Sequence, residues 1–133
     1  MSTLKVNTIQ DTSGGSGSTP EQIDKGRAKA WLNYDQINNN LRGSFNVSSI
    51  TDNASGEFTV NFSASFSATD DYIPVGFVHR SNSAGRVLNH IDSLLSKTTS
   101  AYKVRTSSTT NGQVVGLSSF DSEYVQIAFF GDN

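Results

Sequence analysis

Apolar and polar residues alternate with a period of two along much of this chain, and no other feature restricts its fold as strongly. In the segment 57–62, the sequence EFTVNF places Phe58, Val60 and Phe62 on one face of an extended strand. Aromatic and β-branched side chains fit a half-buried pleated surface, whereas Asn, Gly and Asp supply the turns between strands. The pattern therefore predicts an all-β protein.

The clearest single prediction is a β-hairpin. Its strands are the segments 44–51 and 57–63, and the turn-forming sequence DNASG at 52–56 joins them. Phe45 and Val47 of the first strand are expected to oppose the aromatic face of the second. About six strands are expected in total, as an antiparallel, jelly-roll-like β-sandwich in which two sheets share one core.

Four more strands follow from the same alternation. They are expected over 27–34, 71–80, 101–108 and 123–131. The apolar residues expected to face the core from these strands include Ala30, Leu32, Tyr34, Tyr102, Val104, Val125, Ile127 and Phe129. In the first strand, Lys29 and Trp31 fall on the opposite, cationic face. Pro74 cannot donate a ladder hydrogen bond, so its strand is predicted to lie at a sheet edge or to carry a bulge.

The segment 86–100, RVLNHIDSLLSKTTS, is compatible with two structures. Ile91, Leu94 and Leu95 have the spacing of a helix face, and an irregular strand followed by a Ser/Thr loop is the alternative. The sequence leaves both open.

The N-terminal region differs from the rest of the chain. The run LKVNT at 4–8 has a strand pattern, and the Gly/Ser-rich segment 11–18 is expected to be a flexible tether spanning about 15 Å. A strand by itself buries too little to hold its own backbone, so it requires a partner. The chain therefore divides into an N-terminal segment, residues 1–26, whose strand needs a partner, and a β-sandwich head domain, residues 27–133.

The sequence STPEQIDKG between the tether and the head predicts a short helix. Thr19 is the expected N-cap, and Gln22 completes a capping box with it. Pro20 suits the first helical position, and Gly26 is expected to end the helix.

Composition excludes several classes of function. Charged residues make up 17% of the chain and the formal net charge is −2, so no basic surface is expected to bind nucleic acid. No cysteine is present, which excludes disulfides and thiolate sites. No apolar stretch approaches the length of a membrane span, so membrane insertion is not expected.

No recognisable catalytic motif occurs in the sequence. His79 and His90 lie on different segments without a carboxylate at ligand spacing, and only a trimer axis could gather copies of one of them around a metal. The adjacent carboxylates Asp70 and Asp71 fit a turn better than glycoside hydrolysis, because neighbours in a strand point to opposite faces. We therefore expect no enzyme activity, no cofactor and no metal.

Three Asn-x-Ser triplets, at Asn46, Asn53 and Asn61, match the N-glycosylation pattern. The sequence MSTLKVNTIQ lacks the apolar run of a secretory signal, so we expect none of them to be glycosylated. In a chain rich in Asn and Ser, chance explains the triplets.

One constellation suits sugar binding. An aromatic face stacks on the apolar face of a pyranose while amides bind its hydroxyl groups. The residues of this tentative glycan site are Trp31, Tyr34, Asn38, Asn39 and Asn40. The structural alternative, which we favour, places Tyr34 in the core, packs Trp31 against a neighbour and makes the Asn run a hairpin loop.

Four segments carry a resemblance to a known group of proteins. They are STLKVNTIQDTSG, STPEQI followed by GRAKAW, the hairpin sequence beginning SFNVSSITDN, and the terminal VQIAFFGDN. Together and in this order, they resemble small fibre-type structural proteins of tailed bacteriophages, notably of cyanophages and other marine phages. The loop YDQINNNLRG and the segment 81–100 depart from that pattern, and a host-contact surface is expected to differ in these two loops.

The resemblance implies a virion component on the tail or capsid exterior, a homotrimeric fibre with an N-terminal attachment segment and a C-terminal β-domain. Leu4, Val6 and Ile9 would then form the attachment surface, by burying their apolar sides against other copies or by adding a strand to another virion protein. The alternative is that residues 2–10 fold back as an edge strand of their own domain. The tether would let a threefold head fit a mount of different symmetry.

Three functions are compatible with this interpretation. The head could recognise a host cell-surface glycan or outer-membrane protein through several weak sites. It could instead be a capsid or tail decoration without a ligand. A polysaccharide depolymerase is the distant third.

Overall fold

The computed structural model of the chain describes residues 2–10, 12–15, 17–79, 89–92, 96–110 and 113–133. Within these residues lie eleven strands, one α-helix and one short 3-10 helix. The strands are β1 Ile9–Gln10, β2 Gly17–Ser18, β3 Ala30–Asp35, β4 Asn40–Phe45, β5 Val47–Ala54, β6 Glu57–Phe62, β7 Tyr72–His79, β8 Asn89–Asp92, β9 Ala101–Thr110, β10 Gln113–Ser119 and β11 Tyr124–Gly131. The helices are α1 Pro20–Gly26 and the 3-10 turn Thr69–Asp71.

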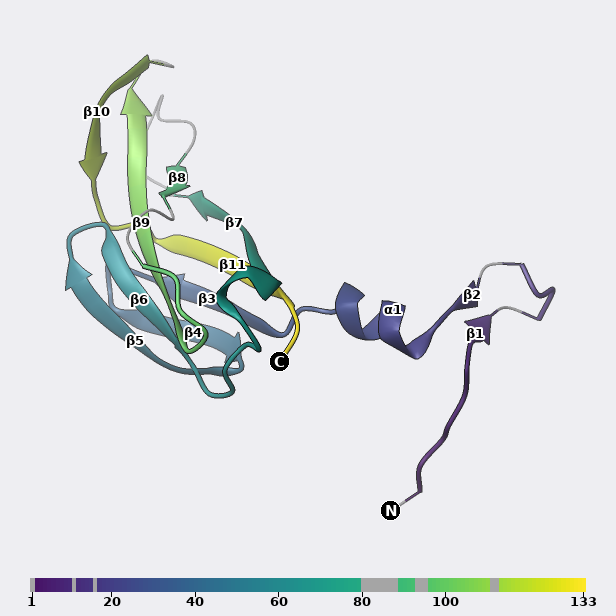
Figure 1. Ribbon diagram of the computed structural model, residues 1–133. Helices are drawn as coiled ribbons and strands as arrows, with labels where there is room; N and C mark the ends of the chain where they lie inside the picture. Colours follow the sequence, from purple (N-terminus) through teal and green to yellow (C-terminus); the bar gives the residue numbers. More distant parts are fainter. Residues whose placement is uncertain (1, 11, 16, 80–88, 93–95, 111–112) are drawn as a thin grey trace.

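Two antiparallel sheets make up the head of the molecule (Figure 1). In the first, the β11 sheet, the strand order is β4–β3–β11–β7. In the second, the β9 sheet, the order is β10–β9–β6–β5, and β8 pairs with β9 beside this path. The predicted all-β class with antiparallel sheets is confirmed, but the expected number of about six strands is too low, because several short strands lack a strong alternation.

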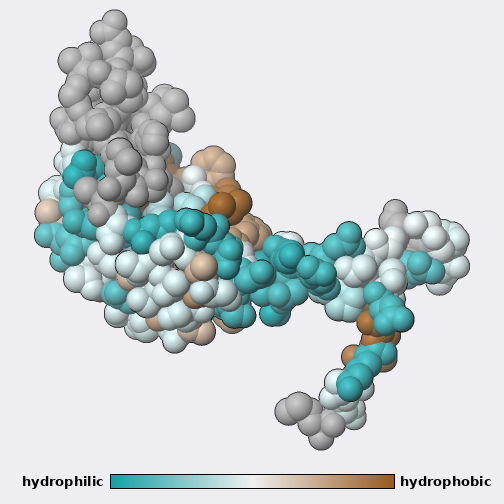
Figure 2. Space-filling model, in the orientation of Figure 1, coloured by the Kyte–Doolittle hydropathy of each residue, from teal (hydrophilic) through white to brown (hydrophobic). Residues whose placement is uncertain are grey.

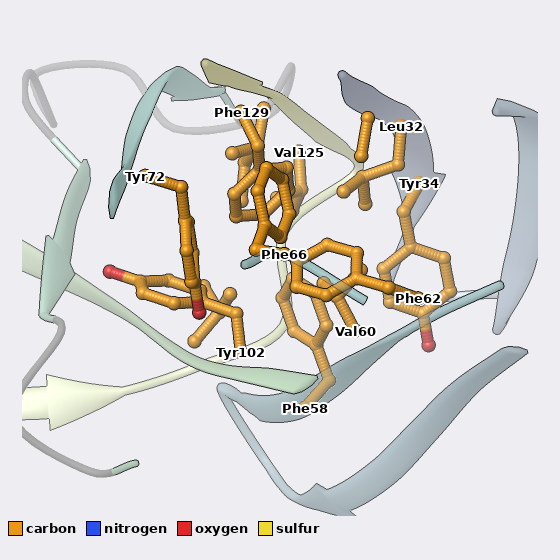
Figure 3. Packing of buried hydrophobic residues seen from close by; sticks show 13 residues of the cluster. Leu32, Tyr34, Phe58, Val60, Phe62, Phe66, Tyr72, Tyr102, Val125 and Phe129 are labelled. Carbon is orange, nitrogen blue, oxygen red and sulfur yellow. The ribbon is translucent and has the colours of Figure 1, made fainter. Parts of the chain in front are cut away.

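One hydrophobic cluster takes its members from both sheets (Figure 3). It consists of Ala30, Leu32, Tyr34, Phe58, Val60, Phe62, Phe66, Tyr72, Tyr102, Val104, Val125, Ile127 and Phe129. The ring of Phe66 stacks on that of Tyr72 with centroids 4.2 Å apart, and Phe62 meets Phe129 edge to face at 5.0 Å. Aromatic rings prefer these geometries over direct face-to-face overlap, and each fully buried ring contributes about 2–3 kcal/mol to stability.

The residues predicted to face the core from β3, β9 and β11 are all buried. The prediction for Lys29 is wrong, because its side chain is buried and not part of an exposed cationic face. The strand begins at Ala30, after Lys29, so the alternation does not reach that residue. Its ammonium group instead forms an ion pair with Asp24 of α1 at 2.6 Å, which compensates the charge removed from water.

The hairpin is confirmed as β5 and β6, with Phe58, Val60 and Phe62 buried on one face. Val47 lies opposite Phe62, as expected. The prediction for Phe45 is wrong: this residue ends β4, pairs with Trp31 and is exposed. Asn46 separates the two strands, because its left-handed backbone (φ 54°) breaks the extended chain between them.

Pro74 lies on β7, which occupies the edge of the β11 sheet. The residue is paired in register with Phe129 of β11. This confirms the predicted edge position. Proline is tolerated on an edge strand because an edge strand has no second neighbour to which its missing amide would donate.

Helix α1 has the predicted N-terminus. The Gln22 amide donates to the Thr19 hydroxyl at 3.2 Å, and the Thr19 amide donates to the Gln22 side chain at 2.9 Å, which completes the capping box. Gly26 is the last helical residue, and the extended Arg27 follows it as the C-cap.

The strand predicted over 4–8 is displaced. The described pairing joins Ile9 to Ser18 and Gln10 to Gly17, so β1 and β2 form a small hairpin within the N-terminal segment. The expected free tether is therefore wrong at its end, because Gly17 and Ser18 satisfy backbone groups of the strand. Among the described residues, β1 pairs with no strand of the two large sheets, which contradicts the fold-back alternative.

The open alternatives for 86–100 are decided in part. Asn89–Asp92 form strand β8, antiparallel to β9, so the strand interpretation is confirmed there. Leu94 and Leu95, on which the helical spacing depended, lie outside the described residues.

Candidate functional site

The N-terminal segment extends away from the head (Figures 1 and 2). Its predicted attachment residues line one groove together. Leu4, Val6 and Ile9 line one groove with Pro20 and Ile23 of α1, with a volume of about 600 Å³. Leu4 is 83% exposed and Ile9 is 55% exposed. Exposed apolar side chains gathered in one groove form a surface that association with another chain would bury.

Helix α1 carries ion pairs, of which Asp24 and Arg27 line this groove, and it connects the groove to the head. Glu21 pairs with Lys25 at 2.8 Å, and Asp24 pairs with Arg27 at 2.9 Å. Asp24 also accepts the buried Lys29 ammonium at 2.6 Å. The hydrogen bond that Lys29 donates lowers the pKa of Asp24, an effect that burial opposes. The helix is therefore held to the first residues of the head by a charged contact.

The structure separates Trp31 from Tyr34 among the predicted glycan residues. Trp31 and Tyr34 lie three positions apart on β3, so they point to opposite faces of the β11 sheet. Tyr34 is buried in the core, and its ring lies 5.0 Å from that of Phe58. Burial raises the pKa of Tyr34 to about 12, with a smaller contribution from the charge of Asp52. Tyr34 is therefore not accessible to a sugar.

The asparagine run shapes the turn between β3 and β4. The Asn38 amides, from its backbone and side chain, donate to Asp35 at 3.2 and 2.9 Å. Asn39 adopts a left-handed backbone (φ 48°), and its side chain accepts the Tyr34 hydroxyl at 2.8 Å. Asn40 is exposed and begins β4. These contacts agree with the structural alternative for the run, a hairpin loop.

Asp35 is the buried anchor of that turn. Besides the Asn38 donors, it accepts the Arg42 guanidinium at 2.7 Å. Burial raises the pKa of Asp35, but the hydrogen bonds from Asn38 and the charge of Arg42 outweigh it and hold this pKa below the ordinary 3.8. The carboxylate therefore remains ionised at neutral pH and organises the turn.

Trp31 belongs to a different surface, which the sequence analysis missed. Cross-strand neighbours Phe45, Trp31, Ala128 and Val75 form one row across all four strands on the outer side of the β11 sheet. Beside this row, the outward positions without charge are Asn33, Gly43, Ile73, Phe77, His79, Tyr124, Gln126 and Phe130. We call these twelve residues the apolar face. Asp35 and its cross-strand partner Asn40 also fall on this side, next to the β3–β4 turn, where Asp35 is buried and paired with Arg42. The continuous apolar run from Ile73 to Val78 was the available signal, because a strand with one wet side would alternate.

The remaining candidates for chemistry are dispersed. His79 lies on the apolar face beside Tyr124, with ring centroids 5.8 Å apart. Asp70 and Asp71 lie in the 3-10 turn, as expected for turn residues. In the part of the chain that the structure describes, no three His, Cys, Asp or Glu side chains are placed to hold a metal ion.

The three Asn-x-Ser asparagines have structural contacts. Asn46 exchanges hydrogen bonds with the backbone of Ala64, accepting at 2.7 Å and donating at 3.1 Å. Asn53 accepts the Thr59 hydroxyl at 2.8 Å. Asn61 donates to Ser49, to both its hydroxyl and its carbonyl. Each amide therefore stabilises the pairing around β5.

Comparisons with protein-family models, curated proteins and solved structures found no match to this chain. Among the residues that the structure describes, no helix combines the length and apolar character needed to cross a membrane. The site geometry and the resemblance of the sequence segments therefore carry the functional argument.

Proposed function

We propose that this protein is a virion structural protein, a trimeric tail fibre that attaches to the particle through residues 1–26 and contributes to recognition of the host surface. The observation that carries the proposal is the N-terminal segment. It extends away from the head (Figure 1). Its residues Leu4, Val6 and Ile9 are exposed and line an apolar groove. Such a segment has no core of its own to fill, and a neighbouring virion protein would supply the missing partner.

The head completes the proposal as an antiparallel, jelly-roll-like β-sandwich, with the two sheets on either side of the aromatic core. In a fibre, a separate segment attaches the protein to the particle and a rigid head faces the host, and this chain has both parts. It needs no active site, and we propose no enzymatic activity. A decoration fibre without a ligand shares every one of these features, and a depolymerase would need an active site in addition.

Antibodies against the full chain test the virion assignment. They are expected to label the tail or capsid exterior of purified phage particles in immunogold electron microscopy, and peptides of the chain are expected in the same particles by mass spectrometry. If purified particles contain neither the antibody label nor peptides of the chain, the proposal is wrong. A glycan array with the full chain separates the two fibre functions, because saturable binding supports recognition and silence supports decoration.

A further inference from the structure

The apolar face contains no Lys, Arg, Asp or Glu. Phe77 is 77% exposed, Phe45 is 55% exposed and Trp31 is 42% exposed, although all three are large aromatic residues. Ile73 and Val75 are also more than half exposed. Figure 2 shows hydrophobic surface on the head where Figure 1 places β7. Depletion of charge with enrichment of aromatic residues is the composition of the centre of a protein interface.

The outer side of the β9 sheet has the opposite character. Glu57 forms ion pairs with Lys103 and Arg105. The Asn61 amide donates to the Thr51 hydroxyl at 3.1 Å, and this polar surface continues along β5. Hydrogen bonds from Arg105 and, to a smaller extent, from Lys103 lower the pKa of Glu57. The described head thus has a polar surface, whose side chains pair with one another, on the outer side of the β9 sheet and an apolar surface on the outer side of the β11 sheet.

The apolar face is also shaped for packing. The Trp31 ring approaches Gly43 closely, since a Cβ added at Gly43 would stand 3.5 Å from its Cζ3 atom and 3.6 Å from its Cη2 atom. A shallow groove of about 360 Å³ runs beside it, between Trp31 and Phe77. Charged groups lie at the border, where Arg42 stacks on the Tyr124 ring at 4.5 Å. An apolar centre with a charged border is the anatomy of a protein interface.

The exposed area of the apolar face is comparable with the area that one partner buries in a protein interface. Since a large aromatic side chain offers about 150–250 Å², the apolar side chains of this face expose on the order of 500 Å². That lies at the upper end of the largest apolar patch on a typical monomer, about 300–600 Å². A stable interface buries about 800 Å² on each partner, and the polar outward residues Asn33, Gln126 and His79 supply further area.

We infer that the apolar face is where copies of this chain pack on one another, with three such faces meeting around the axis of the trimer. The absence of charge favours a second copy as the occupant. Near a rotation axis a charged side chain meets its own symmetry mate, and like charges in contact oppose association. The stoichiometry of three rests on the proposed function, whereas the location of the interface rests on the face alone. Trp31 is then a subunit contact and not a sugar platform.

Trp31 is the single tryptophan, so its fluorescence reports directly on this face. The full chain would be measured over a dilution series by sedimentation equilibrium and by tryptophan emission with acrylamide quenching. We expect a mass three times 14.3 kDa at high concentration, with blue-shifted and protected emission that moves to the red on dilution. Phe77→Lys should raise the concentration of half-dissociation by at least about 30-fold, because all three subunits of each trimer lose an interface hot spot.

Ile37→Lys is the matched control. Ile37 is an exposed apolar residue in the turn between β3 and β4, outside the apolar face, so its variant should associate like the wild type. Phe45→Lys, on the opposite edge strand, repeats the test in case Phe77→Lys does not fold, as judged by circular dichroism.

The outcomes separate this inference from the proposed function. A wild-type trimer that Phe77→Lys and Phe45→Lys leave intact would overturn the apolar face as the interface, and the trimer would stand. A wild-type dimer that these variants dissociate would support the face and overturn the stoichiometry. A monomer at all concentrations would overturn both the interface and the stoichiometry of three. Saturable quenching of Trp31 fluorescence by a glycan would then assign the face to a ligand. The virion labelling experiment tests the virion assignment separately.

Discussion

At the scale of single residues, Gly56 combines a left-handed backbone with a close approach of other main-chain atoms. It ends the β5–β6 turn with a left-handed backbone (φ +72°), and an added Cβ would stand 2.5 Å from the Phe120 amide nitrogen. Its carbonyl accepts the Thr106 amide at 2.7 Å, and its own amide donates to Asp121 at 2.8 Å. This one residue therefore connects the hairpin to β9 and to the chain leading into β11.

Gly56→Ala should lower the free energy of unfolding by about 2–4 kcal/mol, because it adds backbone strain and a clash that only a shift of the main chain can relieve. Urea denaturation of the full chain measures the change. Gly26→Ala is the control, since nothing lies within 4 Å of an added Cβ there and the backbone is not left-handed. Equal stability of the two variants would contradict the assignment of Gly56 as a strained contact.

The buried carboxylate of Asp35 makes stability depend on pH. Its pKa in the folded protein lies below the ordinary 3.8, so the folded state favours the ionised form. The stabilisation is complete well above pH 3.8 and is lost as the pH falls through the lower, folded-state pKa. Asp35→Asn should cost about 1–3 kcal/mol at pH 7 and flatten the stability curve below pH 4.

Urea titrations between pH 2.5 and 7 would measure this effect. Asp52→Asn, at an exposed position on β5, is the control, and its curve should follow the wild type. An acid limb unchanged in Asp35→Asn would assign the pH dependence to other carboxylates.

At the scale of elements, α1 is a helix stabilised by its own sequence. It has no buried residue, yet it carries a complete capping box and two ion pairs. Isolated helices of this length are marginal in water, so its local stability depends strongly on the cap.

Thr19→Ala removes the acceptor for the Gln22 amide and should destabilise the helix by about 1 kcal/mol. Amide exchange at Gln22 should therefore accelerate about fivefold. The Val60 amide in the core should be unaffected, and Thr19→Ser should restore slow exchange at Gln22. Faster exchange at Val60 as well would show that the cap supports the whole molecule and not the helix alone.

At the scale of the whole molecule, the N-terminal segment and the head differ in how their backbones are held. Around Lys5 the chain forms no helix or strand and is exposed, whereas the Lys29 amide donates to the Phe129 carbonyl at 2.8 Å and its side chain is buried. Proteases cut exposed termini in preference to paired backbone.

Trypsin should cleave the full chain after Lys5 at least about tenfold faster than after Lys29. Mass spectrometry of a digestion time course gives both rates, and a heat-unfolded sample controls for intrinsic site preference. Protection of Lys5 in the isolated protein would mean that another copy of the chain, and not a virion protein, covers the N-terminal groove.

Local signals in the sequence were sufficient for the class of the fold. Alternation at Tyr102, Val104, Val125 and Ile127 placed the core correctly, and the cap at Thr19 placed the helix, because these signals depend on neighbours within one strand or one turn. They did not place Phe45 or Lys29, whose environments are set by Trp31 and Asp24 across elements.

The sequence by itself determined that this protein is a β-protein with a capped helix and a distinct N-terminal segment. Only the tertiary structure decided that Trp31 and Tyr34 lie on opposite sides of one sheet. It also decided that Phe45, Val75 and Phe77 lie with Trp31 on the outer side of that sheet. The physical reason is that a face of a sheet is assembled from strands far apart in the chain. Its composition becomes visible only once strand order and register are known.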